Sequence, residues 1–153
     1  MGRALLAVIT LLLLCIVGLG LSVYFTRGEK TYAVDNLLAE ELGRDVATAE
    51  DQGRPVVLAD ITKFEWDQVL VVAKGTPRER IERALGRDFQ GHINYDVESA
   101  ELFVFVRDGE LVRYADYRGR GRFTGVKKPI DKLTPATAVF EVRNMVARPA
   151  KSR

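Results

Sequence analysis

The sequence predicts an α+β domain that follows one N-terminal transmembrane helix. Three observations lead to this fold class. Residues 4–25 are apolar and uncharged, two later segments carry helix start and stop signals, and five short runs are rich in β-branched and aromatic residues. We expect about five mostly antiparallel strands and two helices, with the helices on one face of the sheet. The 153 residues allow one such domain at most.

The apolar run over residues 4–25 has the length of a membrane span. At a rise of about 1.5 Å per residue it covers roughly 33 Å, close to the thickness of about 30 Å of a bilayer hydrocarbon core. Arg3 and Arg27 bracket it. A cleaved signal peptide is the alternative, but its apolar core is usually shorter, and the small residues Gly18-Leu19-Gly20 are followed by more apolar residues.

The predicted span places the chain in the inner (plasma) membrane as a single-pass protein. Positive charges nearly balance across the run, but a short N-terminal tail favours a cytoplasmic N-terminus and an extracytoplasmic C-terminal domain. We therefore divide the chain into a membrane anchor and tether at 1–30, an α+β domain at 31–146 and a basic flexible tail at 147–153. The single cysteine, Cys15, lies in the span, so the soluble part can form no internal disulfide.

The first helix of the domain is expected from Asp35, a capping residue, to Ala49. Gly43 is a possible earlier end. Apolar residues recur along one narrow stripe at helical spacing: Leu37, Leu38, Leu42 and Ala47.

The second helix has the clearest local signal. Thr76 is a candidate N-cap, Pro77 follows at the first helical position, and Glu79 stands three residues after Thr76, which is the pattern of a capping box. Ile81, Ala84 and Leu85 form the expected buried stripe, and Gly86 ends the helix.

Five β-rich runs predict the strands. Residues 56–61 and 69–73 form the first two, with Trp66 between them as a core residue. Residues 102–106 and 111–115 flank Asp108-Gly109, a strong signal for a β-hairpin. In the last strand, 138–143, alternation places Ala138, Phe140 and Val142 inside.

Few residues could carry catalysis. The domain has one histidine, His92, and no cysteine, so we expect no zinc site and no cofactor. Its only serines, Ser99 and Ser152, lack the sequence pattern of a nucleophile. Asp60, Glu65 and Asp67 lie close together in the sequence around an aromatic segment. Two of these three are the only candidates for a catalytic pair of carboxylates. The simpler interpretation is that Glu65 and Asp67 face solvent on either side of Trp66.

The segment 113–128 is unusually basic and is interleaved with glycines and aromatic residues. Such a segment can bind phosphates and stack on planar groups, although it can also be a solvated loop. The candidate binding residues are Arg118, Arg120, Arg122, Phe123, Lys127 and Lys128. On an extracytoplasmic domain near a membrane, the expected partner is an anionic lipid, an envelope polymer or a protein rather than nucleic acid.

The run Thr62–Val69, with the pattern T-x-F-x-W-D-x-V, resembles an uncharacterised family of small bacterial envelope proteins, either membrane-anchored or lipoproteins. The resemblance covers about residues 56–143 and includes the Leu85-Gly86 helix end and the Asp-Gly hairpin. It implies an envelope location and brings no catalytic residues. This chain departs from lipoproteins because Cys15 lacks a lipobox. A looser resemblance to BamE and β-lactamase-inhibitor-protein domains concerns the fold alone.

These observations favour a non-enzymatic binding or assembly module that contacts a partner protein or an anionic envelope component. One alternative is an enzyme acting on glycan or peptidoglycan through Asp60, Glu65 or Asp67. Another is a cytoplasmic-facing binder of nucleic acid or anionic lipid through the basic segment 113–128, the arginine-rich segment. The sequence does not indicate an oligomeric state.

Charge is unevenly distributed along the domain. Residues 31–106 carry 8 basic and 15 acidic side chains, whereas residues 107–153 carry 12 basic and 5 acidic ones. The near-neutral total of +2 therefore hides an acidic first part and a basic second part. Only the folded arrangement decides whether these charges pair or leave a basic face.

Overall fold

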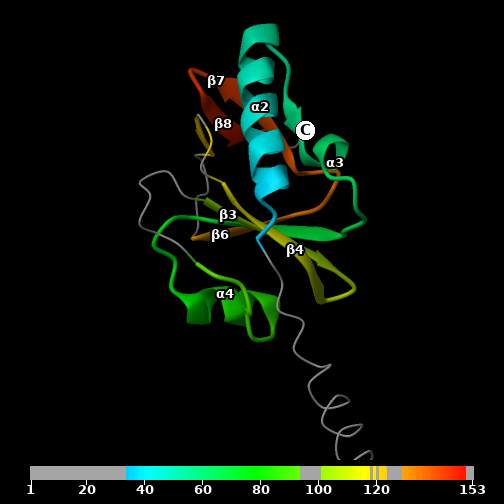
Figure 1. Ribbon diagram of the computed structural model, residues 1–153, viewed down its shortest axis with the longest axis vertical. Helices are drawn as coiled ribbons and strands as arrows, with labels where there is room; N and C mark the ends of the chain where they lie inside the picture. Colours follow the sequence, from blue (N-terminus) through cyan, green and yellow to red (C-terminus); the bar gives the residue numbers. More distant parts are fainter. Residues whose placement is uncertain (1–33, 94–100, 118, 120, 124–128, 151–153) are drawn as a thin grey trace, which may run out of the picture. The chain divides into compact units, whose positions relative to one another are not determined.

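The computed structural model describes residues 34–93, 101–117, 119, 121–123 and 129–150. They form an α+β unit of eight strands in two sheets with three helices (Figure 1). The helices are α2 (Asn36–Gln52), α3 (Leu58–Ile61) and α4 (Arg78–Leu85). The predicted span at 4–25 lies outside the described residues, and no helix within them is long and apolar enough to cross a membrane.

The strands form two four-stranded sheets. The first has the order β4-β3-β2-β6 and contains β2 (Gln68–Val72), β3 (Glu101–Arg107), β4 (Glu110–Tyr117) and β6 (Ile130–Leu133). The second has the order β1-β7-β8-β5 and contains β1 (Val56–Val57), β5 (Arg122–Phe123), β7 (Val139–Arg143) and β8 (Val146–Pro149). Among the described pairs, only β5 and β8 are parallel. The α+β class is thus confirmed. The described residues form eight strands, whereas about five were expected.

The β4-β3-β2-β6 sheet is buried on both faces, and this corrects the expectation of helices on one face. Val69, Val71, Phe103 and Phe105 point into a core shared with α2 and the second sheet. The alternate residues of the same strands, including Leu70 and Val104, point into a second core beneath α4. A sheet covered on both sides needs continuous apolar runs, which explains the composition of β2 and β3.

Helix α2 starts as predicted and ends later. The Leu38 N–H donates to the Asp35 carboxylate at 2.9 Å, and Arg113 pairs with the same carboxylate at 2.7 Å. Burial alone would raise the pKa of Asp35, but these hydrogen bonds outweigh it and hold the pKa below its usual value. The helix continues through Gly43 and ends at Gly53, whose φ is 63°. The buried stripe is Leu38, Leu42, Val46 and Ala49, whereas Leu37 is 74% exposed.

Helix α4 begins at Arg78 with Pro77 as its N-cap, one residue later than the capping box predicts. The Thr76 hydroxyl lies 2.6 Å from the Ala73 carbonyl oxygen and 3.1 Å from that of Pro129. It therefore ties the loop after β2 to the start of β6. Ile81 is buried and Gly86 ends the helix, as expected.

Two predicted segments are corrected. The strand expected at 56–61 keeps only the two residues of β1, because Leu58 begins the helical turn α3. The flexible tail expected from 147 is wrong for its first residues: Val146–Pro149 is β8, which lies between β7 and β5, and Ala147 is fully buried. Trp66 is buried as predicted, and its indole N–H donates to the Thr62 hydroxyl at 2.7 Å.

Two tight turns connect neighbouring strands. The predicted hairpin forms, with Asp108 at φ 52° and Gly109 at φ 77° between β3 and β4. The second hairpin, between β7 and β8, places Asn144 and Met145 at φ 52° and 57°. Both of these backbone N–H groups donate to the Glu50 carboxylate, at 2.8 and 3.1 Å. Since positive φ is unfavourable for Met, we infer that the end of α2 holds this turn in place.

Candidate functional site

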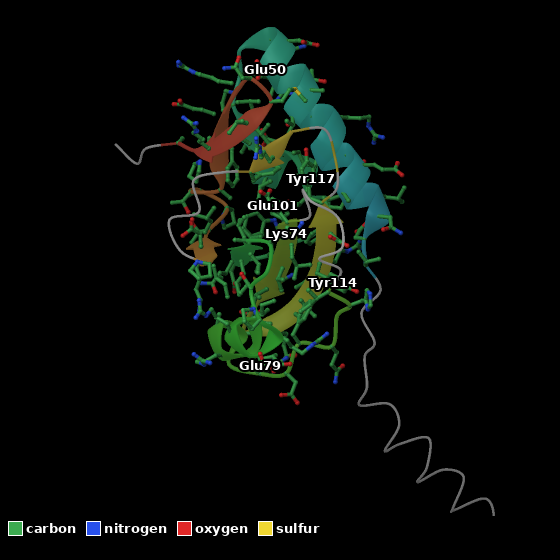
Figure 2. All side chains as sticks on the ribbon, turned by 90° about the vertical axis from the view of Figure 1, so that its left-hand side faces the viewer. Glu50, Lys74, Glu79, Glu101, Tyr114 and Tyr117 are labelled. Atoms are coloured by element: carbon green, nitrogen blue, oxygen red, sulfur yellow. The ribbon has the colours of Figure 1, made fainter. Side chains whose placement is uncertain are left out.

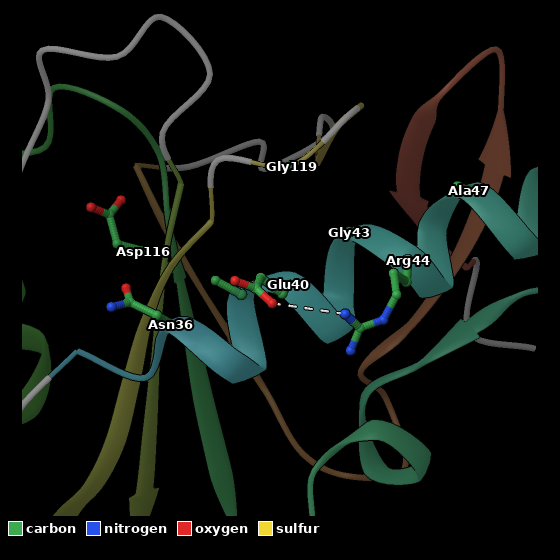
Figure 3. A pocket seen from close by; sticks show the side chains of 8 residues that line it. Asn36, Glu40, Gly43, Arg44, Ala47, Asp116 and Gly119 are labelled. Carbon is green, nitrogen blue, oxygen red and sulfur yellow. Dashed lines mark ion pairs between the residues drawn. The ribbon is translucent and has the colours of Figure 1, made fainter.

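A groove of about 630 Å³ lies along one side of α2, next to the end of β4 (Figure 3). The helix contributes three small residues spaced one turn apart, Ala39, Gly43 and Ala47. Residues four apart share one face of a helix, so these three form a continuous small-residue floor. Gly119 lies beside Gly43: a Cβ added to Gly43 would stand 3.5 Å from the Gly119 Cα.

Polar groups surround this floor. Asp116 on β4 is only 8% exposed, and Figure 3 shows it close to Asn36 at one end of the groove. Glu40 and Arg44 lie one helical turn apart and form an exposed ion pair at 3.8 Å. Among the described lining residues, the groove is therefore apolar along the helix, and its charged side chains are Glu40, Arg44 and Asp116.

Gly43 occupies the interior of α2, where glycine is unfavourable. An added Cβ would make only ordinary van der Waals contacts, with Gly119 at 3.5 Å and the Tyr117 ring at 4.0 Å. We expect Gly43→Ala to raise the free energy of unfolding by about 0.5–1 kcal/mol, because Ala has the higher helix propensity. Urea denaturation of the two proteins measures this. A loss of stability would mean that the backbone at Gly43 cannot accommodate a side chain.

The arginine-rich segment divides between surface and core. Arg118, Arg120, Lys127 and Lys128 lie outside the described residues. Arg122 is exposed on β5. Phe123, by contrast, is 3% exposed and packs among aromatic rings of the core. The interpretation of Phe123 as a surface contact is corrected, because its ring is inside the domain.

Glu101 and Gly121 hold the start of β5. The Phe123 N–H donates to the Glu101 carboxylate at 2.8 Å. Burial raises the pKa of Glu101 to about 7, although this hydrogen bond and the Arg122 charge oppose the shift. At Gly121, φ is 90° and an added Cβ would stand 2.5 Å from the Met145 carbonyl oxygen. This glycine is therefore required for the close approach of β5 to β8.

Tyr117 stands opposite Glu101 in the pairing of β3 with β4, and Figure 2 shows the two residues close together. Burial and the Glu101 carboxylate raise the pKa of Tyr117 to about 12. Buried Tyr117 and half-buried Glu101 are therefore neighbouring titratable side chains, and Tyr117 directly precedes Arg118 in the sequence.

Folding pairs part of the uneven charge. Arg107 contacts Glu65, Arg113 contacts Asp35, and Arg87 contacts Glu110, so each pair joins the acidic first part to the basic second part. Arg113 also stacks over the Phe64 ring, with its guanidinium carbon 4.9 Å from the centroid. Charge separation along the sequence therefore becomes partial interleaving in space.

The candidate carboxylate pair is spread over the exposed surface. Asp60, Glu65 and Asp67 are all exposed. Glu65 pairs with Arg107, and Asp67 accepts a hydrogen bond from the Asp108 N–H at 2.7 Å. Two of the three therefore support the β3–β4 hairpin.

His92 is also exposed, and its backbone N–H donates to the Tyr114 hydroxyl at 3.1 Å. Within the described ranges, no three histidine, cysteine or acidic side chains cluster as metal ligands.

Comparison of the chain with protein-family models, with curated proteins and with solved structures gives no match. The resemblance to small envelope proteins therefore stays a prediction.

The groove contains residues that sequence reasoning did not select. Ala39, Gly43 and Ala47 recur at four-residue spacing, and this signal is visible in the sequence. A glycine inside a helical pattern also indicates a helix end, which is the meaning first given to Gly43. Nothing local indicates Asp116, whose position in the groove depends on how α2 packs beside β4.

Proposed function

We propose that this chain is a single-pass, membrane-anchored binding module of the cell envelope, with a partner protein bound in the groove beside α2. In this proposal residues 4–25 cross the plasma membrane, the N-terminus is cytoplasmic and the α+β domain is extracytoplasmic. The observation that carries it is the groove itself, whose floor of small residues leaves room for another chain beside α2.

The chemistry of the groove defines the partner segment. Small residues let another backbone approach the helix closely, because little side-chain volume stands between the two chains. The exposed Leu37, at the N-terminal end of α2, adds apolar surface on the same helix. We therefore propose that the occupant is a protein segment with apolar residues.

The arginine-rich segment extends this proposal. Gly119 lines the groove, and Arg118 and Arg120 are its immediate neighbours in the chain. Together with Arg122, they would contact acidic groups of the partner beyond the groove. Changing Arg118, Arg120 and Arg122 to Ser tests this extension separately, because it leaves the groove floor intact.

The alternatives have less support. An enzyme using paired carboxylates needs two of them in one concave, partly buried site, whereas Asp60, Glu65 and Asp67 are exposed. A nucleic-acid binder would need a cytoplasmic domain. A reporter fused after Arg153 distinguishes these topologies, because activity only from a cytosol-dependent reporter would contradict the extracytoplasmic location.

Site-specific photocrosslinking in the native membrane tests the groove. A photoreactive amino acid at position 47 should give a discrete protein adduct, whereas the same group at position 48, exposed on the same helix, should not. The adduct should be lost with Ala39→Leu, which fills the floor, and kept with Asp51→Leu on an exposed part of α2. Adducts of equal strength from both positions, or an adduct that survives Ala39→Leu, would contradict groove binding.

A further inference from the structure

A second, smaller hollow of about 300 Å³ lies between α4 and β6. It is at the far end of the domain from the C-terminal end of α2: Figure 2 shows Glu79 on α4 and Glu50 on α2 at opposite ends. Its lining combines three cations with three apolar residues: Arg80, Arg83, Lys132, Ala84, Pro129 and Ile130.

Helix α4 places two of these cations, Arg80 and Arg83, on the side of the helix that faces the hollow. Ile81 points into the core, so Arg80 and Arg83 lie on one flank of α4 and Glu82 on the other, by the 100° rotation per residue of a helix. Glu82 accepts a hydrogen bond from the Phe89 N–H on that other side. Arg78 lies on the same flank as Glu82, where it donates to the Phe89 and Gly91 carbonyl oxygens, and Glu79 lies one helical turn before Arg83.

Strand alternation has the same effect on β6. Ile130 and Lys132 pair with Val72 and Leu70, whose side chains belong to the core beneath α4. Asp131 pairs with Val71, which points to the opposite face of the sheet. The one acidic residue of β6 is thus directed away from the hollow.

The three cations remain available to an anion. Within the part of the chain that the structure describes, Arg80 and Arg83 make no ion pair, and both are exposed. Lys132 donates to the Ala84 carbonyl oxygen at 2.6 Å, which fixes its ammonium group at the end of α4 without neutralising it. A cluster of three cations attracts phosphate, because Arg binds phosphate oxygens through paired N–H groups.

The chain enters the domain at the β4 edge of the sheet, where the Asp35 N–H donates to the Tyr114 carbonyl oxygen at 2.9 Å, whereas the hollow lies at the opposite, β6 edge. Val34, the first described residue, packs against the same core cluster as Ala84 and Ile130. Eight residues separate Val34 from Phe25, where the predicted span ends. They can reach at most about 30 Å when fully extended. If residues 4–25 cross the membrane, a tether of this length keeps the domain as a whole near the bilayer surface.

We propose that the hollow between α4 and β6 binds the phosphate group of an anionic phospholipid, with Arg80, Arg83 and Lys132 as its ligands. Ala84, Pro129 and Ile130 supply an apolar wall for the glycerol part of the lipid. Two further lysines, Lys127 and Lys128, directly precede Pro129 in the sequence. The proposal rests on the membrane anchor of the proposed function and is independent of the groove beside α2.

Native mass spectrometry of the full chain in neutral detergent measures lipid binding directly. We expect one phosphatidylglycerol to bind about tenfold more tightly than phosphatidylcholine. Arg80→Gln with Arg83→Gln should weaken phosphatidylglycerol binding about 10- to 30-fold, since a basic residue near a lipid surface contributes on the order of a factor of five. Lys132→Gln should give an independent loss of about fivefold.

Arg143→Gln with Arg148→Gln is the matched control. It removes the same charge from exposed positions on β7 and β8 and should leave binding unchanged within a factor of two. Equal losses in both double variants, or no loss in the Arg80/Arg83 variant, would overturn the site. Binding of inorganic phosphate through the same arginines, without a preference for phosphatidylglycerol, would contradict the proposal that the bound phosphate belongs to a lipid. Photocrosslinking from position 47 does not depend on these residues, so failure here leaves the groove proposal standing.

Discussion

Replacement of Phe123 with Ala is expected to lower the free energy of unfolding by about 3–5 kcal/mol. The Phe123 ring contacts three others edge-on, with centroid distances of 4.9 Å to Phe103, 5.1 Å to Tyr117 and 5.0 Å to Phe140. Because these rings come from both sheets, Phe123 links the sheets through the core. Truncation would remove this link and leave a cavity that the surrounding strands can fill only in part. Urea denaturation monitored by circular dichroism gives the difference.

Arg122→Gln is the control for this experiment. Arg122 precedes Phe123 in the same short strand but is exposed, so its replacement should change stability by no more than about 0.5 kcal/mol. If Phe123→Ala lowered the free energy of unfolding as little as Arg122→Gln, Phe123 would not be part of the core and would again be a candidate surface contact.

Glu101→Gln is expected to stabilise the protein at pH 8 and to have little effect near pH 4.5. In the folded protein the pKa of Glu101 is raised to about 7 from its ordinary value of 4.5, chiefly by burial. The folded state therefore holds a proton that the unfolded state has already released between these two pH values. Stability falls as pH rises through this window and is constant above it. The gain at pH 8 should be about 2–3 kcal/mol.

The measurement is the free energy of unfolding of both proteins at several pH values between 4.5 and 8. Taking the difference between variant and parent cancels the groups that titrate in both. Glu141→Gln, an exposed carboxylate on β7, is the matched control and should show no such trend. A difference between Glu101→Gln and the parent that does not change with pH would contradict the raised pKa. Gln can still accept the hydrogen bond from the Phe123 N–H, so the variant isolates the effect of charge.

Several elements were predictable because their signals are local. Asp35 caps α2 through its own side chain, and Asp108-Gly109 favours positive φ at the hairpin turn. Alternation in β7 correctly placed Phe140 and Val142 in the core. In each case the relevant interaction joins residues only a few positions apart, so a single sequence contains the necessary information.

Other elements were not predictable because distant residues stabilise them. Most of β8 falls in the segment 147–153 that was predicted as a basic flexible tail, and Asn144-Met145 before it is not a typical turn pair. Its turn is held by the Glu50 carboxylate, which comes from the far end of α2. Similarly, 56–61 has the composition of a strand, but only Val56 and Val57 find a partner, in β7. Composition alone does not reveal whether a partner strand exists.

The sequence by itself determined the α+β class and the division of the domain into an acidic and a basic part, and it predicts a membrane anchor outside the described residues. The tertiary structure decided which charges pair and which remain available. Arg107 and Arg113 are paired with acidic residues from the first part of the domain, while Arg80 and Arg83 come together with Lys132. The physical reason is that charge interactions depend on distances in space, which the packing of α2, α4 and two sheets sets across 40 residues or more of chain.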